Sequence, residues 1–135
     1  LFYNAHPTGE LVTRALWANF PSDARTIGIN GQFMLGSAVL LSPVLDQGAT
    51  SVNAYFPQGL WYDFKTRSLA VDASTGGMAQ TLDTPLTSTN VHILGGNTLP
   101  LQEAAMTTTV GRTTPFTLLV ALCANGGSNM RSLRD

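Results

Sequence analysis

The sequence predicts a mainly β protein, a β-sandwich that is entered from a short helix-strand-helix segment. Residues 50–56 alternate, with Val52, Ala54 and Phe56 on one face of a predicted strand. Other short apolar segments follow, with turn signals about every eight to twelve residues. No second helical pattern interrupts them, and together these observations favour a sandwich of short strands.

The first elements differ in kind from the rest. Two aromatic residues and a leucine in residues 1–6, followed by Pro7-Thr8-Gly9, predict the last turns of a helix and its break. Residues 11–20 mix β-branched and aromatic residues around one charge, Arg14, and stop at a proline. This composition predicts a strand.

The next segment leads into the sandwich. Residues 21–24 predict the start of a short helix that Ser22 or Asp23 caps, and residues 32–36 are expected to close this helical or turn segment. The apolar run 37–45 is too short for a free-standing helix, so it predicts a strand buried on both faces.

The remaining strands follow from composition and turn residues. Pro57-Gln58-Gly59 supplies a turn, and residues 60–64 return as an aromatic strand, so an antiparallel unit is expected at the centre of the chain. Pro85 favours an edge position for the strand that contains it. Residues 116–122 are apolar on both faces and predict a central strand. The other predicted strands are 69–71, 79–86, 91–94 and 98–102.

Composition excludes several classes of protein. Of the 135 residues, 44% are hydrophobic and 11% charged, which excludes a disordered chain. Seven basic residues against eight acidic ones give a net charge of -1 without a basic stripe, so no nucleic-acid partner is expected. The lone Cys123 excludes an internal disulfide and a cysteine-built zinc site. Apolar runs fall far below the roughly 18 residues of a membrane span, so no membrane partner is expected.

Several motifs keep a fixed order and spacing between residues 32 and 63. They are Gln32-Phe33, Gly36, Ser42-Pro43-Val44-Leu45, Gly48-Ala49 and Tyr55-x-Pro57-x-Gly59-x-Trp61-Tyr62-Asp63. Together they resemble glycoside hydrolase family 31, the α-glucosidase and α-xylosidase group. The resemblance covers residues 1 to about 123. It departs at Arg14-Ala15, where the family usually has Arg-Pro, and fails after Ala124.

The resemblance implies three parts. Residues 1–36 would end the (β/α)8 catalytic barrel, residues 37–115 would form the proximal C-terminal β-sandwich, and residues 116–135 would start the distal β-domain and a divergent tail. Without a leading Met, the sequence is expected to be part of a longer chain. Without barrel neighbours, the side chains of Leu16, Trp17 and Phe20 would be exposed or repacked.

The resemblance also implies an activity for the parent enzyme. It would be a retaining hydrolase of terminal non-reducing α-linked glucose, or an α-xylosidase, without metal or organic cofactor. The resemblance favours a secreted, vacuolar or lysosomal location, and the chain itself does not indicate a compartment. The implied partners are the catalytic barrel of the parent and its α-glucoside substrate.

Retaining hydrolysis requires two carboxyl groups about 5 to 5.5 Å apart. The candidates are Glu10, Asp23, Asp46, Asp63, Asp72, Asp83, Glu103 and Asp135. Turn positions account for Asp46, Asp72 and Asp83, and the family uses the segment around Asp63 for domain packing. The family's catalytic Asp motifs and its sugar-holding Arg and His have no counterpart here. No catalytic, cofactor-binding or metal-binding residue is therefore assigned, and the segment is predicted to be structural.

The histidines and aromatics leave one alternative function. His6 and His92 lie far apart without a Cys or carboxylate at ligand spacing, and His92 is expected at a surface or edge. Cys123 is expected to be a small buried hydrophobe. The alternative is a carbohydrate-binding β-sandwich with Trp61, Tyr55 and Tyr62 as an exposed sugar platform.

Overall fold

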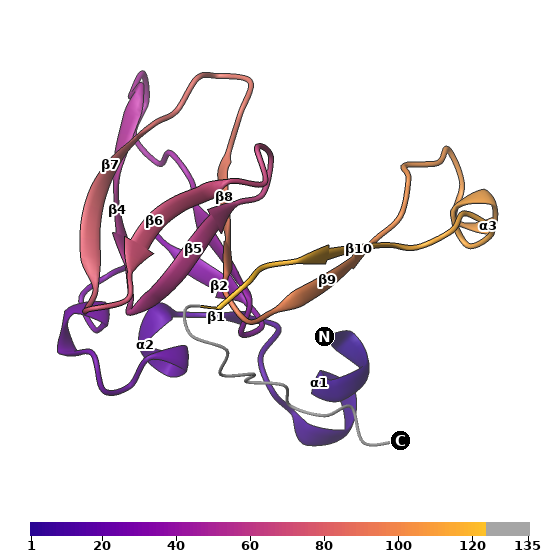
Figure 1. The fold of residues 1–135 in the computed structure, drawn as a ribbon, viewed down its shortest axis with the longest axis horizontal. Helices are drawn as coiled ribbons and strands as arrows, with labels where there is room; N and C mark the ends of the chain where they lie inside the picture. Colours follow the sequence, from indigo (N-terminus) through magenta and orange to yellow (C-terminus); the bar gives the residue numbers. More distant parts are fainter. Residues whose placement is uncertain (124–135) are drawn as a thin grey trace.

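The computed structural model describes residues 1–123, except the side chain of Asn4, and it is mainly β, as predicted (Figure 1). The predicted divergent tail and Asp135 lie outside the described residues. The helical elements are α1 (Phe2–Thr8), α2 (Leu16–Asn19), the 3-10 helix η1 (Ala24–Thr26) and α3 (Thr108–Gly111). The strands are β1 (Thr13–Arg14), β2 (Phe33–Leu35), β3 (Val39–Ser42), β4 (Ser51–Phe56), β5 (Gly59–Asp63), β6 (Leu69–Ala73), β7 (Met78–Asp83), β8 (Asn90–Leu94), β9 (Thr98–Leu101) and β10 (Thr117–Val120).

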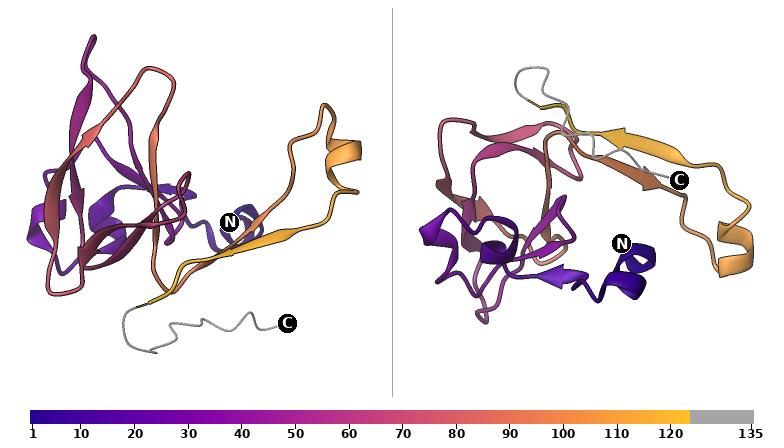
Figure 2. Two further views of the ribbon diagram at one scale, coloured as in Figure 1. Left: turned by 45° about the horizontal axis from the view of Figure 1, so that its top comes forward. Right: turned by 90° about the horizontal axis from the view of Figure 1, so that it is seen from below.

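The strands form one large sheet and two antiparallel pairs. The large sheet has six strands in the order β1-β2-β3-β8-β5-β6, and β4 pairs with β7 while β9 pairs with β10. In Figure 1 the β4–β7 pair lies across the β5–β6 end of the large sheet. The β9–β10 pair projects away from both as a ribbon that carries α3 near its tip, as Figure 2 shows from two other sides.

The core lies between the β4–β7 pair and the large sheet. Strand β4 contributes Ala54 and Phe56, both at most 1% exposed, and their neighbour Trp61 on β5 is fully buried. The other members of this buried cluster come from α2, β2, β3 and β6, and they are Leu16, Met34, Leu40, Val71 and Ala73. Two layers of strands with a shared apolar interior make a β-sandwich.

The N-terminal segment confirms the predicted helix cap and corrects the bounds of two other elements. Helix α1 exists as predicted but ends two residues later than expected, because it continues through Pro7 and Thr8 until Gly9 adopts the left-handed conformation at φ 69°. Asp23 caps η1 by accepting a hydrogen bond from the Arg25 backbone N–H at 3.2 Å. The strand predicted over residues 11–20 is wrong beyond β1.

A helical turn, α2, replaces the second half of that predicted strand. Residues 15–19 contain two alanines and a leucine, which favour helix, and no β-branched residue. The turn places Leu16 in the core at 0% exposure, while Trp17 remains 53% exposed and Phe20 is half-buried. Leu16 is thus fully buried within this chain.

The segment after η1 also differs from its prediction. Residues 33–35 form strand β2 and not the end of a helix, because the left-handed Gly36 (φ 60°) turns the chain into a β2–β3 hairpin. Strand β3 is shorter than the predicted 37–45. It buries only one face, that of Leu40 and Ser42, because no second layer covers its other face in the described part of the chain.

The central strands are confirmed individually but do not pair as expected. Strand β4 has the predicted alternation, with Ala54 and Phe56 buried. Strand β5 follows the predicted turn, yet β4 pairs with β7 and β5 pairs with β6 and β8. The turn at residues 57–58 therefore crosses from one layer of the sandwich to the other.

The strand predicted over residues 116–122 forms as β10, but its predicted central position is wrong. Strand β10 pairs only with β9 among the described residues, and Phe116, Leu118 and Val120 are 57 to 68% exposed. Apolar residues on both faces of a strand do not indicate whether another layer covers those faces.

No helix within residues 1–123 is long and apolar enough to cross a bilayer. The three-part domain division remains a prediction.

Candidate functional site

The carboxylates are placed mostly by turns. Asp63, at the end of β5, accepts hydrogen bonds from the backbone N–H groups of Lys65 at 2.8 Å and Thr66 at 2.6 Å. Burial opposes ionisation of this side chain, but the hydrogen bonds from Thr66 and Lys65 hold the pKa of Asp63 below its ordinary value. The carboxylate therefore stabilises the β5–β6 turn.

The other acidic side chains have similar local roles. Asp72 accepts from the Ser74 N–H at 3.0 Å, and its hydrogen bonds to Ser74 lower its pKa. Glu10 forms an exposed ion pair with Arg14 at 2.8 Å. Exposed positions hold the remaining candidates of the described chain, which are Asp46, Asp83 and Glu103.

One cluster of polar side chains joins elements that are distant in sequence. The phenol of Tyr55 on β4 donates a hydrogen bond to Asp23 Oδ2, and Asp23 Oδ1 also accepts from Arg25 Nε at 3.1 Å. Arg25 Nη1 donates to the Gly77 carbonyl oxygen at 3.1 Å, and its guanidinium lies 5.0 Å from the centre of the Tyr55 ring. These contacts tie η1 to β4 and to the β6–β7 turn.

The cluster shifts the pKa values of its members in opposite directions. The hydrogen bond from Tyr55, with those from Arg25, lowers the pKa of Asp23. Burial, followed by the hydrogen bond to Asp23, raises the pKa of Tyr55 to about 12. The phenol thus remains protonated and keeps donating to the carboxylate at neutral pH.

A buried amide holds Tyr55 from the other side. Gln32, 5% exposed, accepts from the Tyr55 N–H at 2.7 Å and donates to the Tyr55 carbonyl oxygen at 3.2 Å. Its Nε2 also donates to Ser42 Oγ at 2.8 Å. A buried amide with both ends bonded fixes the backbone of β4 against β3.

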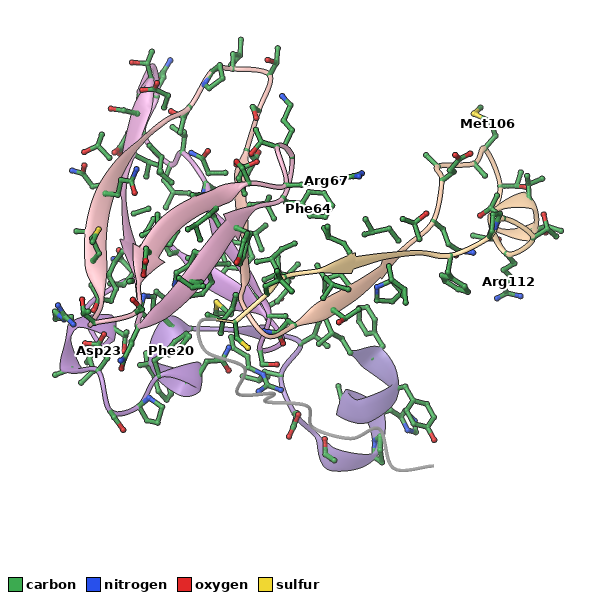
Figure 3. The ribbon with its side chains drawn as sticks, in the orientation of Figure 1. Phe20, Asp23, Phe64, Arg67, Met106 and Arg112 are labelled. Carbon is green, nitrogen blue, oxygen red and sulfur yellow. The ribbon has the colours of Figure 1, made fainter. Side chains whose placement is uncertain are left out.

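Beside this cluster lies a cavity of about 400 Å³, which we call the turn pocket. Three turns form its walls: residues 19–23 with Arg25, the β4–β5 turn at residues 57–58, and Gly76 with Gly77. Figure 3 labels Phe20 and Asp23, which lie at the end of the sandwich below β4 and β7 in that view. The first-named wall precedes the sandwich in sequence, so the pocket is assembled by tertiary packing.

Each of three cavities in the structure has one carboxylate in its wall. The turn pocket has Asp23, a cavity of about 360 Å³ beside the β5–β6 turn has Asp63, and one of about 390 Å³ beside Gln32 has Asp46. Retaining glycoside hydrolysis needs two carboxyl groups facing one bond. None of these three cavities supplies such a pair.

The histidine predictions are partly corrected. His92 is 1% exposed in β8, between β3 and β5 of the large sheet, and it is not a surface residue. Its ring meets Phe56 edge-on at 4.9 Å, and its Nδ1 has no hydrogen-bond partner in the described part of the chain. His6 lies exposed in α1. Within residues 1–123, no three His, Cys, Asp or Glu side chains gather as a metal site.

The predicted sugar platform is wrong at its central residue. Trp61 is fully buried and donates from Nε1 to the Pro57 carbonyl oxygen at 2.8 Å. Tyr62 is half-buried, and Tyr55 is occupied by Asp23 and Arg25. The side chain of an aromatic residue in a strand can point to the core or to the solvent, and that of Trp61 points into the core. Cys123 is only partly buried, so the expected burial is not complete.

Sequence reasoning missed the roles of Arg25, Tyr55 and Gly77. Tyr55 and Asp23 are 32 positions apart, and Arg25 and Gly77 are 52 apart, so no local spacing relates them. Gly77 follows Gly76, and two adjacent glycines are a weak indication of a turn. A Cβ at this position would overlap the Tyr55 hydroxyl and approach Arg25 Nη2 to 2.9 Å, so any other residue would displace both side chains.

Comparison with known proteins identifies the family. The model of the glycosyl hydrolase family 31 C-terminal domain matches residues 9–99. An α-glucosidase of Hordeum vulgare is 48% identical over 126 residues, which are 93% of this chain and 14% of the relative. Alpha-xylosidase 1 of Arabidopsis thaliana is 42% identical over 124 residues, 92% of this chain and 13% of the relative.

Solved structures show the same fold. The GH31 dextranase of Flavobacterium johnsoniae, complexed with glucose, superposes with a TM-score of 0.79 at 31% identity, over 87% of this chain and 14% of that one. A glucosidase II alpha subunit superposes with a TM-score of 0.83 at 27% identity, over 90% of this chain and 13% of that one. The chain thus spans about a seventh of these proteins. It belongs to glycoside hydrolase family 31, and the part it represents is the family's C-terminal domain.

Proposed function

We propose that this chain is the structural C-terminal part of a retaining α-glucosidase that acts on terminal non-reducing α-linked glucose. The observation that carries the proposal is the 48% identity, over 93% of this chain, to an enzyme named an α-glucosidase. The alternative parent is an α-xylosidase, which the 42% identity to the Arabidopsis thaliana enzyme supports less strongly.

The placement of the acidic side chains supports a role without catalysis. Asp63 and Asp72 serve their own turns, and Asp23 is engaged by Tyr55 and Arg25. A nucleophile and a proton donor facing one glycosidic bond would have to come from elsewhere in the parent. The contribution of this chain is then to brace the region that carries them.

Exposed apolar side chains support the proposal that another part of the parent packs against this chain. Near the N-terminus, Phe2, Leu11 and Trp17 are 79, 70 and 53% exposed. In the ribbon, Phe116, Leu118 and Val120 are similarly exposed. Large exposed apolar groups mark surfaces that contact another part of a protein. We infer that the catalytic barrel of the parent covers the N-terminal group.

The test uses the enzyme that contains this chain, with 4-nitrophenyl α-glucoside as substrate and proton NMR as the readout, because the only sugar that this substrate releases is the transferred glucose unit. We expect α-glucose to appear before its β-anomer, because retention passes through two inversions. First release of β-glucose contradicts the retaining mechanism. Faster cleavage of 4-nitrophenyl α-xyloside than of 4-nitrophenyl α-glucoside contradicts the assignment to glucose.

A second measurement tests the structural role of the chain itself. The isolated chain should not hydrolyse 4-nitrophenyl α-glucoside. Turnover that survives purification and disappears in an Asp23→Asn or Asp63→Asn variant would assign catalysis to this chain and overturn the proposal. An Asp83→Asn variant is the matched control, since Asp83 is exposed at the end of β7.

A further inference from the structure

The turn pocket has the dimensions and mixed walls of a small-ligand site. Its volume of about 400 Å³ lies in the range of about 300–1,000 Å³ that is typical of such sites. Arg25 ties two of the three turns together, because it bonds to Asp23 and to the Gly77 carbonyl oxygen. Gln58 ties the third, since its Nε2 donates to the Ser74 carbonyl oxygen at 2.9 Å. The cavity is therefore held in shape by bonds between distant parts of the chain.

The charged groups in the pocket wall neutralise each other. Asp23 and Arg25 form an ion pair at 3.1 Å, and the second carboxylate oxygen accepts from Tyr55. No other charged side chain lines the pocket within the described part of the chain. A neutral wall does not concentrate a phosphate or a metal ion, so the chemistry favours an uncharged ligand.

The polar groups of the wall retain hydrogen-bonding capacity of both kinds. Asn19 and Gln58 each use their amide nitrogen, donating to the carbonyl oxygens of Gly36 at 2.6 Å and Ser74 at 2.9 Å. Their amide planes are thus fixed, and their side-chain oxygens have no donor among residues 1–123. The guanidinium of Arg25 has five N–H groups, more than its bonds to Asp23 and Gly77 use. Acceptors and donors together suit hydroxyl groups, which need both.

The remaining wall is apolar. Half-buried Phe20 and exposed Pro21 line the pocket, and the Phe20 ring packs against buried Trp61 with centroids 6.3 Å apart. A ring supported from behind by the core keeps its orientation. Apolar surface beside a few polar groups suits the face of a pyranose, which carries C–H groups within a rim of hydroxyls.

From this combination we propose that the turn pocket binds a neutral sugar, one glucose-sized unit of an α-linked glucan. The neutral polyhydroxylated class follows from the walls. The choice of glucose within that class rests on the proposed function. The site would let this domain hold a part of the substrate of its parent.

The experiment titrates maltose into the ¹⁵N-labelled 135-residue chain and follows backbone amide shifts by NMR. We expect saturable shifts that are concentrated at Ser22, Gln58 and Gly76, with dissociation constants of millimolar order. Inorganic phosphate at the same concentrations should not produce them, because the wall carries no unpaired cation. Shifts that are absent up to about 50 mM maltose, or that phosphate reproduces, would overturn the proposal.

Two variants and one control locate the site. Ser22→Trp fills the mouth of the pocket from an exposed position and should abolish the shifts. Gln58→Ala removes one hydrogen-bonding group and should weaken binding about two- to tenfold. Ser51→Trp, also at an exposed position but at the opposite end of β4, should bind as the unchanged chain does. Binding that survives Ser22→Trp in a variant with a dispersed, folded spectrum places the sugar elsewhere and overturns the proposal.

The outcome is distinguishable from failure of the proposed function. If the parent releases α-glucose from 4-nitrophenyl α-glucoside but maltose leaves the amide signals of the turn pocket unshifted, only the pocket inference fails. If maltose binds the pocket but the parent cleaves α-xylosides instead, the proposed substrate fails and a sugar site remains. Xylose is therefore the second probe of the same titration.

Discussion

The sandwich and the β9–β10 ribbon are built from similar apolar strands, yet one buries them and the other does not. In the sandwich, Trp61, Phe56 and Leu40 are fully buried, whereas Leu118 and Val120 of the ribbon are 64 and 57% exposed. The difference is the second layer. The β4–β7 pair covers the large sheet, while no described element covers β10. An apolar strand becomes core only where another element faces it.

The buried side also gains specific contacts that the ribbon lacks. Phe56 meets Trp61 edge-on at 5.9 Å and His92 at 4.9 Å. Each aromatic pair of this kind contributes about 0.5–1.5 kcal/mol beyond the area it buries. The ribbon instead depends on its backbone pairing from Thr117 to Val120. We therefore expect the two regions to respond very differently to the same truncation.

The largest effect is expected at Trp61. A Trp61→Ala variant loses the buried ring and its hydrogen bond to Pro57, so the free energy of unfolding should fall by about 3–5 kcal/mol. In the ribbon, Phe116→Ala removes a ring that is already 68% exposed. This variant should change the free energy of unfolding by less than about 0.5 kcal/mol. Urea unfolding followed by tryptophan or tyrosine fluorescence measures both. Equal losses would show that the ribbon is packed in solution and would contradict the contrast between the two regions.

The next effect concerns the boundary of the sandwich. Leu16 precedes the sandwich strands in sequence but is 0% exposed within their core, so Leu16→Ala should destabilise the fold by about 2–5 kcal/mol. Leu11→Ala, at a position 70% exposed, is the matched control and should have little effect. Amide exchange should agree, with protection at Phe20, whose N–H donates to Leu16 at 2.9 Å. If Leu16→Ala leaves the free energy of unfolding unchanged, the N-terminal segment does not contribute to the stability of the sandwich.

These two regions also show what the sequence can predict. Alternation located β4 correctly, because one face of that strand is buried and the other is not. The same reasoning failed for residues 116–122, since an apolar pattern on both faces is equally compatible with a central strand and an uncovered one. It failed for residues 15–19, where burial of Leu16 favours a helical turn that local composition only weakly indicates.

The candidate site was less predictable than the fold. Asp23 was expected as a helix cap, and it is one. Its bond to Tyr55 could not be predicted, because 32 intervening positions separate them and the contact depends on how β4 crosses the core. The burial of Trp61 and His92 likewise depends on which layer faces each strand, and this is a property of the whole fold.

A smaller effect, which depends on pH, is expected at His92 in the buried part of the sandwich. Burial holds the pKa of His92 below its ordinary value, although Asp63, its register neighbour on β5, opposes this. The neighbour on β3 is Leu40 and the ring contact on β4 is Phe56, so Asp63 is the charged group that faces it. The unfolded chain therefore binds a proton below about pH 6.5 that the folded chain does not. Stability should be retained above that pH and lost as the pH falls through it.

The measurement compares unfolding free energies at pH 7.5 and 5.5. His92→Gln should lose less stability on acidification than the unchanged chain, even if its stability at pH 7.5 is lower. His6→Gln is the control, because His6 is exposed in α1, and it should show the same acid loss as the unchanged chain. Identical acid losses in all three would assign the effect to carboxylates and not to His92.

The smallest effect is local and lies where the two layers meet η1. Burial and then the hydrogen bond to Asp23 raise the pKa of Tyr55 to about 12. Asp23→Asn removes the carboxylate but not the burial, so the pKa of Tyr55 should fall while staying above its ordinary value of about 10. Absorbance titration in a Tyr3→Phe, Tyr62→Phe background isolates Tyr55, since the chain has three tyrosines. Asp83→Asn, at the exposed end of β7 that pairs with Ser51, should leave the pKa of Tyr55 unchanged. If Asp23→Asn also leaves it unchanged, burial in the sandwich accounts for the shift, and the bond from η1 contributes nothing to it.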